Sequence, residues 1–581
     1  MDALARRLRL RTQPTIFFAS AGLMVLFLLA LLLFPTQLNA TFGAGREWIV
    51  TNLGWYFIFG VTAWFIMLLI VAFGPYGQIR LGRKNVPPEY SFVSWFTMLF
   101  AGGIGTILMF WGVAEPISHF GTPPRAGVEP YSAQAATQAM NFSLYHLSLH
   151  TWTIFCLPGL AFAYFIHRYE LPVRVSSVFY PLLKEGIYGP AGRAIDIIAI
   201  LGTLFGVAVS IGLGTTQIGA GLDALYGWDN DVLLQVLIII VLEAVAITSI
   251  VRGMDRGVKT LSNINIGLAV ALMLFVFLTG GMSLFLLREV FQTLGNFVAA
   301  LPSLMLWNDA LAPVTKEAGW GWQGGWTVFY WAWTVSWAPF MGIFLARISK
   351  GRTIREFVLG VLFAPSLFTL VWFVIFGWSA LRIDGIGGDG GEISAAVAES
   401  VPLAMFAFFE HYPLTQILQG FAVVIVAIFF ATSSDSASLV VDMLCTGDGE
   451  PGPTHQRVFW GVSEGVLAAL LIVLAGDEGL SALQQVITVV GLPMFTLMFL
   501  AGISLLIALR KERLHFVTEV RGIPSEAIEA GKEAEARGEI GYDPQARLAE
   551  SEGASTGGGT TRGDIPDDGA TDDGARTPAR S

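Results

Sequence analysis

The segment from Thr432 to Ser436 combines side chains that could bind a small cation within an otherwise apolar stretch. It reads Thr-Ser-Ser-Asp-Ser, so that consecutive hydroxyl groups and one carboxylate offer hard oxygen ligands. Serine and threonine hydroxyls also bond to the preceding turn of their own helix. The segment alone therefore leaves both an ion site and ordinary helix chemistry open.

A second informative stretch is the aromatic run from Trp326 to Lys350. Tryptophan normally gathers at the two interfaces of a membrane. Here Trp331, Trp333 and Trp337 lie well along a segment long enough to cross a bilayer. This position favours an aromatic lining of an internal solute path.

Two further features place polar chemistry inside apolar runs. Glu243 lies within the apolar stretch 233–247, and an intramembrane carboxylate indicates a function such as a proton relay. The alternative is a hydrogen-bonded structural glutamate that faces a neighbouring span. Gly102, Gly103 and Gly105 lie close together in another apolar run, where they permit local unwinding of a helix or, alternatively, close helix packing.

The elements that must position these residues are membrane-spanning helices. The chain has 581 residues, of which 54% are hydrophobic and only 13% charged, which is typical of a polytopic membrane protein. Two cysteines give no disulfide framework, the net charge of −10 gives no support for nucleic-acid binding, and no nucleophile-base constellation indicates an enzyme. Twelve apolar runs can cross a bilayer: 15–36, 52–74, 91–114, 138–166, 194–224, 231–250, 260–283, 326–348, 356–379, 413–440, 457–475 and 483–509.

Basic residues predict the topology of these spans. They concentrate in alternate connections, which should be cytoplasmic, so that both termini lie in the cytoplasm of a multi-pass plasma-membrane protein. The predicted organisation is a basic N-terminus (1–14), a transporter domain (15–509) and an acidic, mostly disordered C-terminal tail (510–581). The apolar segment 290–307 is too interrupted to cross, and it predicts an external helix lying against the bundle.

The residues from about 74 to 493 resemble the betaine/choline/carnitine transporter (BCCT) family. The matching motifs are Gly74-Pro-Tyr-Gly-Gln-Ile-Arg-Leu-Gly82, Pro88-Glu-Tyr-Ser, Met109-Phe-Trp-Gly-Val-Ala-Glu-Pro116, Gly253-Met-Asp-Arg-Gly-Val-Lys-Thr-Leu-Ser-Asn-Ile-Asn265, the tryptophan run through Arg355, Thr432-Ser-Ser-Asp-Ser436, and Leu483-Gln484 with Gly491-Leu-Pro493. The resemblance implies an all-α, leucine-transporter-like architecture of about twelve spans. Two inverted five-helix repeats, spans 3–7 and 8–12, would follow two extra N-terminal spans. It also implies a homotrimer and a substrate site between spans 3, 4 and 8.

Departures from the family pattern concern the aromatic box, which in relatives surrounds quaternary ammonium compounds. The resemblance places the box at Leu147, Trp152, Phe155 and Thr334, of which only two are aromatic. Trp333 and Trp337 are expected to gate or line the same path. For each of these rings, ordinary core packing is the alternative.

Span 3 departs from the family pattern as well. The unwound segment expected here includes Gly103 and Gly105, and Ile107 replaces a third glycine. Thr106 could donate a hydrogen bond to a substrate carboxylate or sulfonate, or bond back to its own helix.

The resemblance also implies two sodium sites. One would use Ala101, Ile104, Phe429, Thr432 and Ser433, and it retains its hydroxyl pair. The other would use Thr203 and Phe340, but Val207 replaces its second threonine. We therefore expect sodium as the coupling ion through the first site, with no other metal and no cofactor.

The sequence thus predicts a secondary transporter that imports a zwitterionic compatible-solute-like or amino-acid-like molecule by sodium symport with alternating access. Because the box has lost two walls, glycine betaine is expected to be a weak substrate. The alternative is a family-default transporter of glycine betaine, choline or carnitine that works by proton coupling or exchange. An osmosensor is disfavoured by the acidic tail, and a channel by the asymmetric arrangement of unwound and Trp-rich spans.

Overall fold

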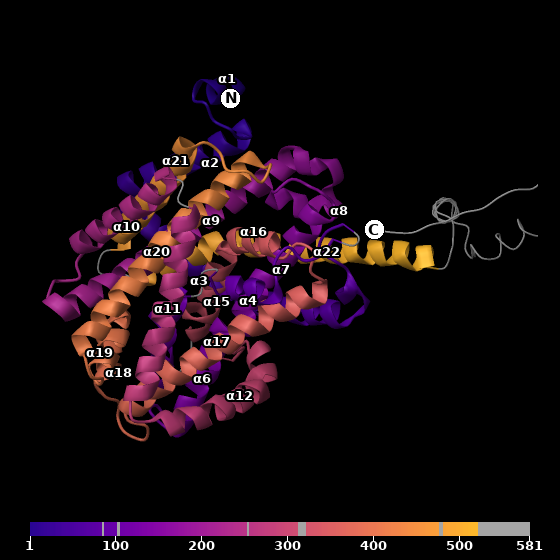
Figure 1. Cartoon of the computed structure of the whole chain (residues 1–581). Helices are drawn as coiled ribbons and strands as arrows, with labels where there is room; N and C mark the ends of the chain where they lie inside the picture. The colour runs from indigo at the N-terminus through magenta and orange to yellow at the C-terminus, as the bar shows by residue number, and fades with distance from the viewer. Residues whose placement is uncertain (84–85, 102–104, 253–254, 312–320, 476–479, 521–581) are drawn as a thin grey trace, which may run out of the picture. The chain divides into compact units, whose positions relative to one another are not determined.

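The computed structural model describes residues 1–83, 86–101, 105–252, 255–311, 321–475 and 480–520 (Figure 1). The described residues form helices and loops, apart from an isolated antiparallel bridge between Arg80 and Thr353. The chain divides into a first unit, Met1–Leu509, which holds the candidate site residues discussed below, and a second unit, Arg510–Ser581. Most of the predicted C-terminal tail lies outside the described residues.

The helices of the first half are α1 (Asp2–Arg7), α2 (Pro14–Leu33), α3 (Pro35–Phe73), η1 (Pro75–Gln78), α4 (Phe92–Ala101), α5 (Gly105–Gly121), α6 (Ala133–Leu147), α7 (Leu149–His167), η2 (Val175–Phe179), α8 (Tyr180–Leu183), η3 (Lys184–Tyr188), α9 (Pro190–Tyr226), α10 (Val232–Arg252), α11 (Asp255–Thr279) and α12 (Ser283–Met305). Those of the second half are α14 (Trp322–Gly325), α15 (Thr327–Ser336), α16 (Ala338–Ile348), α17 (Ile354–Ile383), α18 (Glu392–Glu399), η4 (Val401–Leu403), α19 (Ala404–Phe409), α20 (Thr415–Thr446), α21 (Thr454–Ala475) and α22 (Leu480–Val520).

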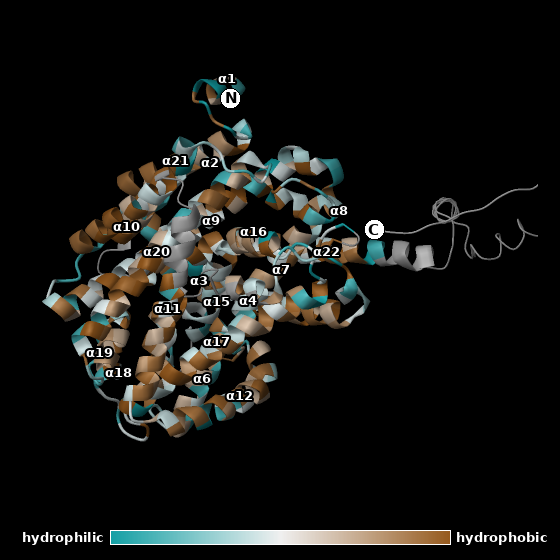
Figure 2. Ribbon diagram, viewed as in Figure 1, coloured by the Kyte–Doolittle hydropathy of each residue, from teal (hydrophilic) through white to brown (hydrophobic). Residues whose placement is uncertain are grey.

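Long apolar helices dominate this architecture. In the described part of the chain, ten helices are long and apolar enough to cross a membrane, or eleven when one bent pair is counted as a single span. Each predicted apolar run falls on one helix or on a pair of consecutive helices, although α3 begins at Pro35, well before the predicted run 52–74. Hydrophobic residues cover most of these helices, while hydrophilic residues gather in α1 and in the connecting loops (Figure 2). The prediction of an all-helical polytopic membrane protein is confirmed.

Two spans that the sequence predicted as continuous are interrupted. The tryptophan-rich span bends by 55° between α15 and α16. Pro339 explains the bend, because it has no N–H for the carbonyl one turn earlier. The other span is interrupted at Ser148, whose φ of −112° and ψ of −115° are not helical. There the Thr151 hydroxyl donates to the His146 carbonyl at 2.5 Å, so that a side chain satisfies a backbone group close to the break.

The helix contacts repeat with two-fold symmetry. The first repeat comprises α4 with α5, α6 with α7, α9, α10 and α11; the second comprises α15 with α16, α17, α20, α21 and α22. The first span of each repeat packs against the second span of the other, as α5 on α17 and α16 on α7. The third spans, α9 and α20, pack on each other, and so do the fourth spans, α10 and α21. Five spans in each repeat give the second repeat the opposite sense through the membrane when α12, which lies between the repeats, does not cross.

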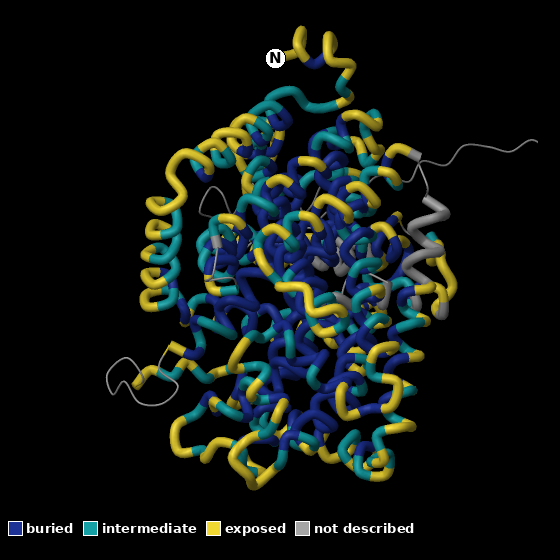
Figure 3. The backbone as a smooth tube through the Cα atoms, turned by 90° about the vertical axis from the view of Figure 1, so that its left-hand side faces the viewer, coloured by how far each residue is buried: buried dark blue, intermediate teal, exposed yellow. Residues whose placement is uncertain are grey.

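Burial separates an inner from an outer set of helices. The helices α6, α7 and α9 are mostly buried, whereas α2, α10 and α12 bury only a minority of their residues. Buried backbone gathers in the interior of the bundle, and exposed backbone lies along its outside (Figure 3). The predicted helix at 290–307 begins earlier, at Ser283, and ends at Met305. This helix, α12, packs against α6 and α17. By length and composition it also qualifies as a span, which the interrupted pattern of its sequence did not predict.

Candidate substrate and ion sites

Two tryptophans of α15 and of its junction with α16 meet a single serine on α9. The indole N–H of Trp333 donates to the Ser210 hydroxyl at 2.9 Å. The indole N–H of Trp337 donates to the same oxygen at 3.1 Å and to the Gly206 carbonyl at 3.3 Å. The Ser210 hydroxyl itself donates to the Gly206 carbonyl at 2.9 Å. The orientation of both predicted gating rings is therefore fixed by one residue of a neighbouring helix.

Glycine at position 206 makes this arrangement possible. A Cβ atom there would lie 2.8 Å from the Cβ of Ser336, closer than real side chains approach. The backbone of α9 can therefore come within hydrogen-bonding reach of Trp337. A small residue therefore allows close packing between two helices at this position.

The remaining residues at the predicted box positions lie on α6, α7 and α15. Trp152 and Phe155 of α7 are buried, and their rings meet edge to face at 5.7 Å between centroids. Leu147 is the last residue of α6, and Thr334 lies between the two gating tryptophans; both are buried. Because α7 packs against α15 and α16, the structure brings the helices of all four positions together.

The predicted residues of span 3 fall largely outside the described part of the chain. Helix α4 ends at Ala101, and α5 begins at Gly105. The residues between the two helices, including Gly103 and Ile104, are not described, and neither are the side chains of Ala101 and Thr106. The predicted unwinding of this segment and the role of Thr106 therefore remain predictions.

The predicted sodium ligands of the second repeat lie on α20. Phe429 is buried, and Thr432 and Ser433 are half-buried. The Thr432 hydroxyl donates to the carbonyls of Ile428 and Phe429, at 2.9 and 3.0 Å, so the back-bonding that the sequence left open does occur. A hydroxyl that donates in this way keeps its oxygen lone pairs as acceptors. Because α20 packs against α5, the structure brings this helix beside the first span of the first repeat.

The second predicted sodium site lacks one of its expected oxygen ligands. The Thr203 hydroxyl donates to the Ala199 carbonyl at 2.8 Å, and its side chain is fully buried. Phe340 lies on α16, which packs against α9, and Val207 is buried one turn beyond Thr203. The helices α9 and α16 are in contact, but valine supplies no oxygen ligand.

The whole spanning region matches one family model. Residues 15–514 match the model described as BCCT, betaine/carnitine/choline family transporter. The chain belongs to this family. An ectoine/glycine betaine/proline transporter of Corynebacterium glutamicum is 45% identical over 498 residues, which cover 86% of this chain and 80% of that relative. A glycine betaine transporter of Vibrio parahaemolyticus is 40% identical over 506 residues, which cover 86% of this chain and 94% of that relative.

Among solved structures, a manganese transporter of Eremococcus coleocola is similar with a TM-score of 0.38 and 14% identity, covering 82% of this chain and 94% of that one. Family membership identifies the chain as a multi-pass membrane transporter. The two-fold pattern of helix contacts described above agrees with the architecture that the resemblance implied.

A buried polar network in this transporter was not predicted from its sequence. Both oxygens of Glu115 on α5 are engaged: Oε1 lies 2.6 Å from His146 Nδ1 on α6, and Oε2 accepts the Tyr330 hydroxyl at 2.7 Å from α15. His119 Nε2 lies 3.2 Å from Oε1, and His146 Nε2 lies 2.9 Å from the Thr327 hydroxyl. The spacing of Glu115 and His119 places them on one helix face and could have suggested their contact. No comparable spacing in the sequence indicated the contacts of Glu115 with His146 on α6 and Tyr330 on α15.

This network ties the first span of one repeat to the first span of the other. Glu115, His119 and His146 have ligand atoms within 4.8 Å of one another, as a metal site would require. However, the hydrogen bonds from His146 and Tyr330 already satisfy both oxygens of the carboxylate. We therefore interpret the network as a buried lock between α5, α6 and α15 rather than as a metal centre.

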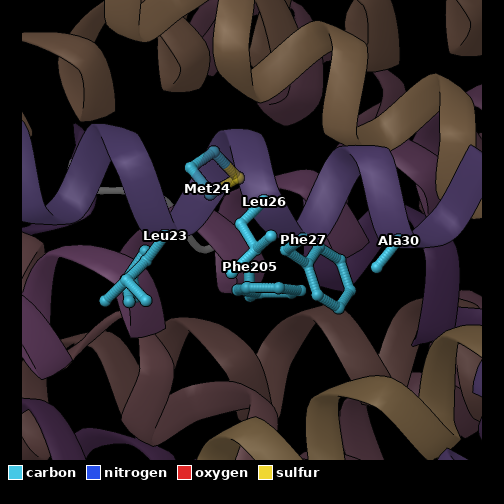
Figure 4. A pocket seen from close by; sticks show the side chains of 7 residues that line it. Leu23, Met24, Leu26, Phe27, Ala30 and Phe205 are labelled. Carbon is cyan, nitrogen blue, oxygen red and sulfur yellow. The ribbon is translucent and has the colours of Figure 1, made fainter.

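An apolar groove of about 360 Å³ lies elsewhere, between α2 and α9. Leu23, Leu26, Phe27 and Ala30 of α2 line it together with Phe205 of α9 (Figure 4). This lining offers no polar partner to a zwitterion. The groove therefore differs in chemistry from the candidate substrate site.

Proposed function

We propose that this transporter imports small zwitterionic solutes that carry N–H donors, such as ectoine or proline, by sodium symport with alternating access. The observation that carries the proposal is the mixed composition of the four box positions. Trp152 and Phe155 supply aromatic faces, whereas Leu147 and Thr334 do not. The relative from Corynebacterium glutamicum is named for ectoine and proline as well as for glycine betaine.

The chemistry of the solutes explains this preference. A quaternary ammonium group cannot donate hydrogen bonds, so its binding depends on surrounding ring faces, worth about 2 kcal/mol or more when desolvated. Loss of half the walls would forfeit a comparable amount, roughly a factor of 30 in affinity. A solute with N–H groups can instead donate to an oxygen such as the Thr334 hydroxyl.

Sodium coupling is supported by the hydroxyl pair on α20. Thr432 and Ser433 offer adjacent hard oxygen ligands on a helix that packs against α5. Sodium bound there would stabilise one arrangement of the first repeat's first span relative to α20. A downhill sodium gradient would then drive uptake of the solute.

The second candidate function is transport of glycine betaine, choline or carnitine by proton coupling or exchange. It is favoured by the name of the Vibrio parahaemolyticus relative, which is a glycine betaine transporter. In this case, other rings would have to replace the missing walls at Leu147 and Thr334.

Uptake into proteoliposomes distinguishes the two functions. With an inward sodium gradient, we expect ectoine or proline to accumulate and to be competed only weakly by glycine betaine. The double substitution Leu147→Trp with Thr334→Trp should improve glycine betaine relative to the native solute. Micromolar glycine betaine uptake that is insensitive to Trp152→Leu would contradict the solute assignment. Equal uptake in sodium and potassium media would contradict the coupling assignment.

A further inference from the structure

Glu243 is joined by a second buried glutamate, Glu464, in the space between α10, α20 and α21. Glu243 is 6% exposed, and Glu464 is 0% exposed. The Ser434 hydroxyl lies 3.1 Å from Glu243 Oε1 and 3.4 Å from Glu464 Oε2. The Ser438 hydroxyl lies 3.3 Å from the same Glu464 oxygen. Two carboxyl groups from different helices therefore share one serine.

Glycines of α21 make room for this arrangement. A Cβ atom at Gly465 would lie 2.5 Å from the Glu243 Cγ, and one at Gly461 would lie 3.2 Å from the Ser438 hydroxyl. Side chains of α10 and α20 thus approach the backbone of α21 at two positions one helical turn apart. Larger residues would displace them, so the local backbone is shaped around these polar groups.

If both glutamates were ionised, the hydroxyl groups around them would supply too few protons to hydrogen-bond all of their carboxylate oxygens. The single proton of the Ser434 hydroxyl can be donated to only one of its two glutamate neighbours. Glu464 Oε1 is buried and has no hydrogen-bond partner among the described residues. Two unpaired negative charges in such a site are strongly disfavoured. A proton bound to one carboxyl group removes one charge and lets that group donate a hydrogen bond.

Other charged groups near the pair have hydrogen-bond or ion-pair partners of their own. Arg457 of α21 lies 3.9 Å from Asp435 of α20, and Ser249 of α10 donates to Asp435 at 3.1 Å. Asp442 of α20 accepts from Gln456 and from the Gly452 N–H, and Asp196 of α9 accepts from Ser176. The helices α2 and α3 also pack on α21; α2 carries no titratable side chain, and the charged residues of α3 are Arg46 and Glu47. Within the described part of the chain, neither glutamate forms an ion pair with a basic side chain.

We propose that Glu243 and Glu464 form a proton-binding site in which one proton is held by the pair, and that its release strengthens sodium binding at Thr432 and Ser433. The second part rests on the proposed sodium function. Ser433 and Ser434 are consecutive on α20, so the glutamate pair contacts the residue next to a candidate sodium ligand. Raising the pH removes the proton and leaves an additional negative charge. For an assumed separation of about 10 Å and an effective dielectric constant of about 20, this charge should raise sodium affinity by about one order of magnitude.

Infrared spectroscopy of the purified full chain tests the proton site directly. The wild type should show the C=O band of a protonated carboxylic acid, which shifts in D2O and disappears as the pH rises. Glu464→Gln and Glu243→Gln should each remove or shift this band, whereas Glu289→Gln on α12 should leave it unchanged. Should neither glutamine variant fold, Ser434→Ala supplies the comparison, because it keeps both carboxyl groups and removes their shared hydroxyl. The absence of such a band, with or without a bound cation, would overturn the proton site.

Sodium titration of uptake tests the link to transport. In the wild type, the sodium concentration for half-maximal uptake should fall about tenfold from mildly acidic to mildly alkaline pH. In Glu464→Gln it should be independent of pH. A pH-independent sodium requirement in the wild type would overturn the link, while the infrared result would still decide the proton site. Uptake without any sodium dependence would refute the proposed function and leave the infrared test intact.

Discussion

Replacing Ser210 by alanine removes the oxygen that holds two indole rings. In the structure the hydroxyl accepts N–H groups from Trp333 at 2.9 Å and from Trp337 at 3.1 Å. Trp337 retains a bond to the Gly206 carbonyl at 3.3 Å, but Trp333 would be left with an unsatisfied buried donor. One such donor costs about 1–3 kcal/mol. Ser210→Ala should therefore lower the free energy of unfolding by roughly that amount.

The same substitution should affect transport, because these rings flank Thr334 at a predicted box position. If the cost falls on the substrate-bound state, KM should rise by about fivefold to a hundredfold. The measurements are initial uptake rates over a range of solute concentrations, together with thermal unfolding in detergent. Ser336→Ala is a matched control, since Ser336 is also buried but donates only to the Ala332 carbonyl of its own helix. An unchanged KM in Ser210→Ala, or an equal effect in Ser336→Ala, would refute the reasoning.

Two further substitutions test other contacts of the fold. Tyr330→Phe removes the donor to Glu115 Oε2 and should destabilise the protein by about 1.5–3 kcal/mol, so an unchanged melting temperature would contradict the proposed lock. Gly206→Ala would place a Cβ 2.8 Å from that of Ser336 and should cost about 1–3 kcal/mol by overpacking. Gly420→Ala provides its control in thermal unfolding, because a Cβ there meets no atom within 4 Å and should instead be neutral or stabilising.

Periodicity and length were sufficient to predict the spans but not their breaks. Apolar runs report burial in a bilayer, so each predicted run falls on a helix or a helix pair. The bend before Pro339 follows from one residue and was within reach of the sequence. The interruption at Ser148 was not, because a serine within an apolar helix normally bonds to the preceding turn without breaking the helix.

The candidate site shows the same division between local and distant information. The sequence singled out Glu243 because its own surroundings are apolar, but it gave no reason to pair that residue with Glu464 on another helix. Ser210 was missed for a related reason, since a single serine in an apolar helix carries no pattern. Contacts between helix faces depend on rotation and packing of whole helices, and one sequence does not specify them.

The hydrogen bonds around the candidate substrate site fall into two groups with different consequences for alternating access. Glu115 joins α5 to α6 and α15, which would have to move together as long as the buried lock persists. The bonds from Trp333 and Trp337 to Ser210 instead cross from α15 to α9. If α15 rocks against α9 during transport, only the second group must break. Ser210→Ala should then change the balance between inward-facing and outward-facing states, measurable as altered accessibility of an introduced cysteine, whereas Tyr330→Phe should lower stability without shifting that balance.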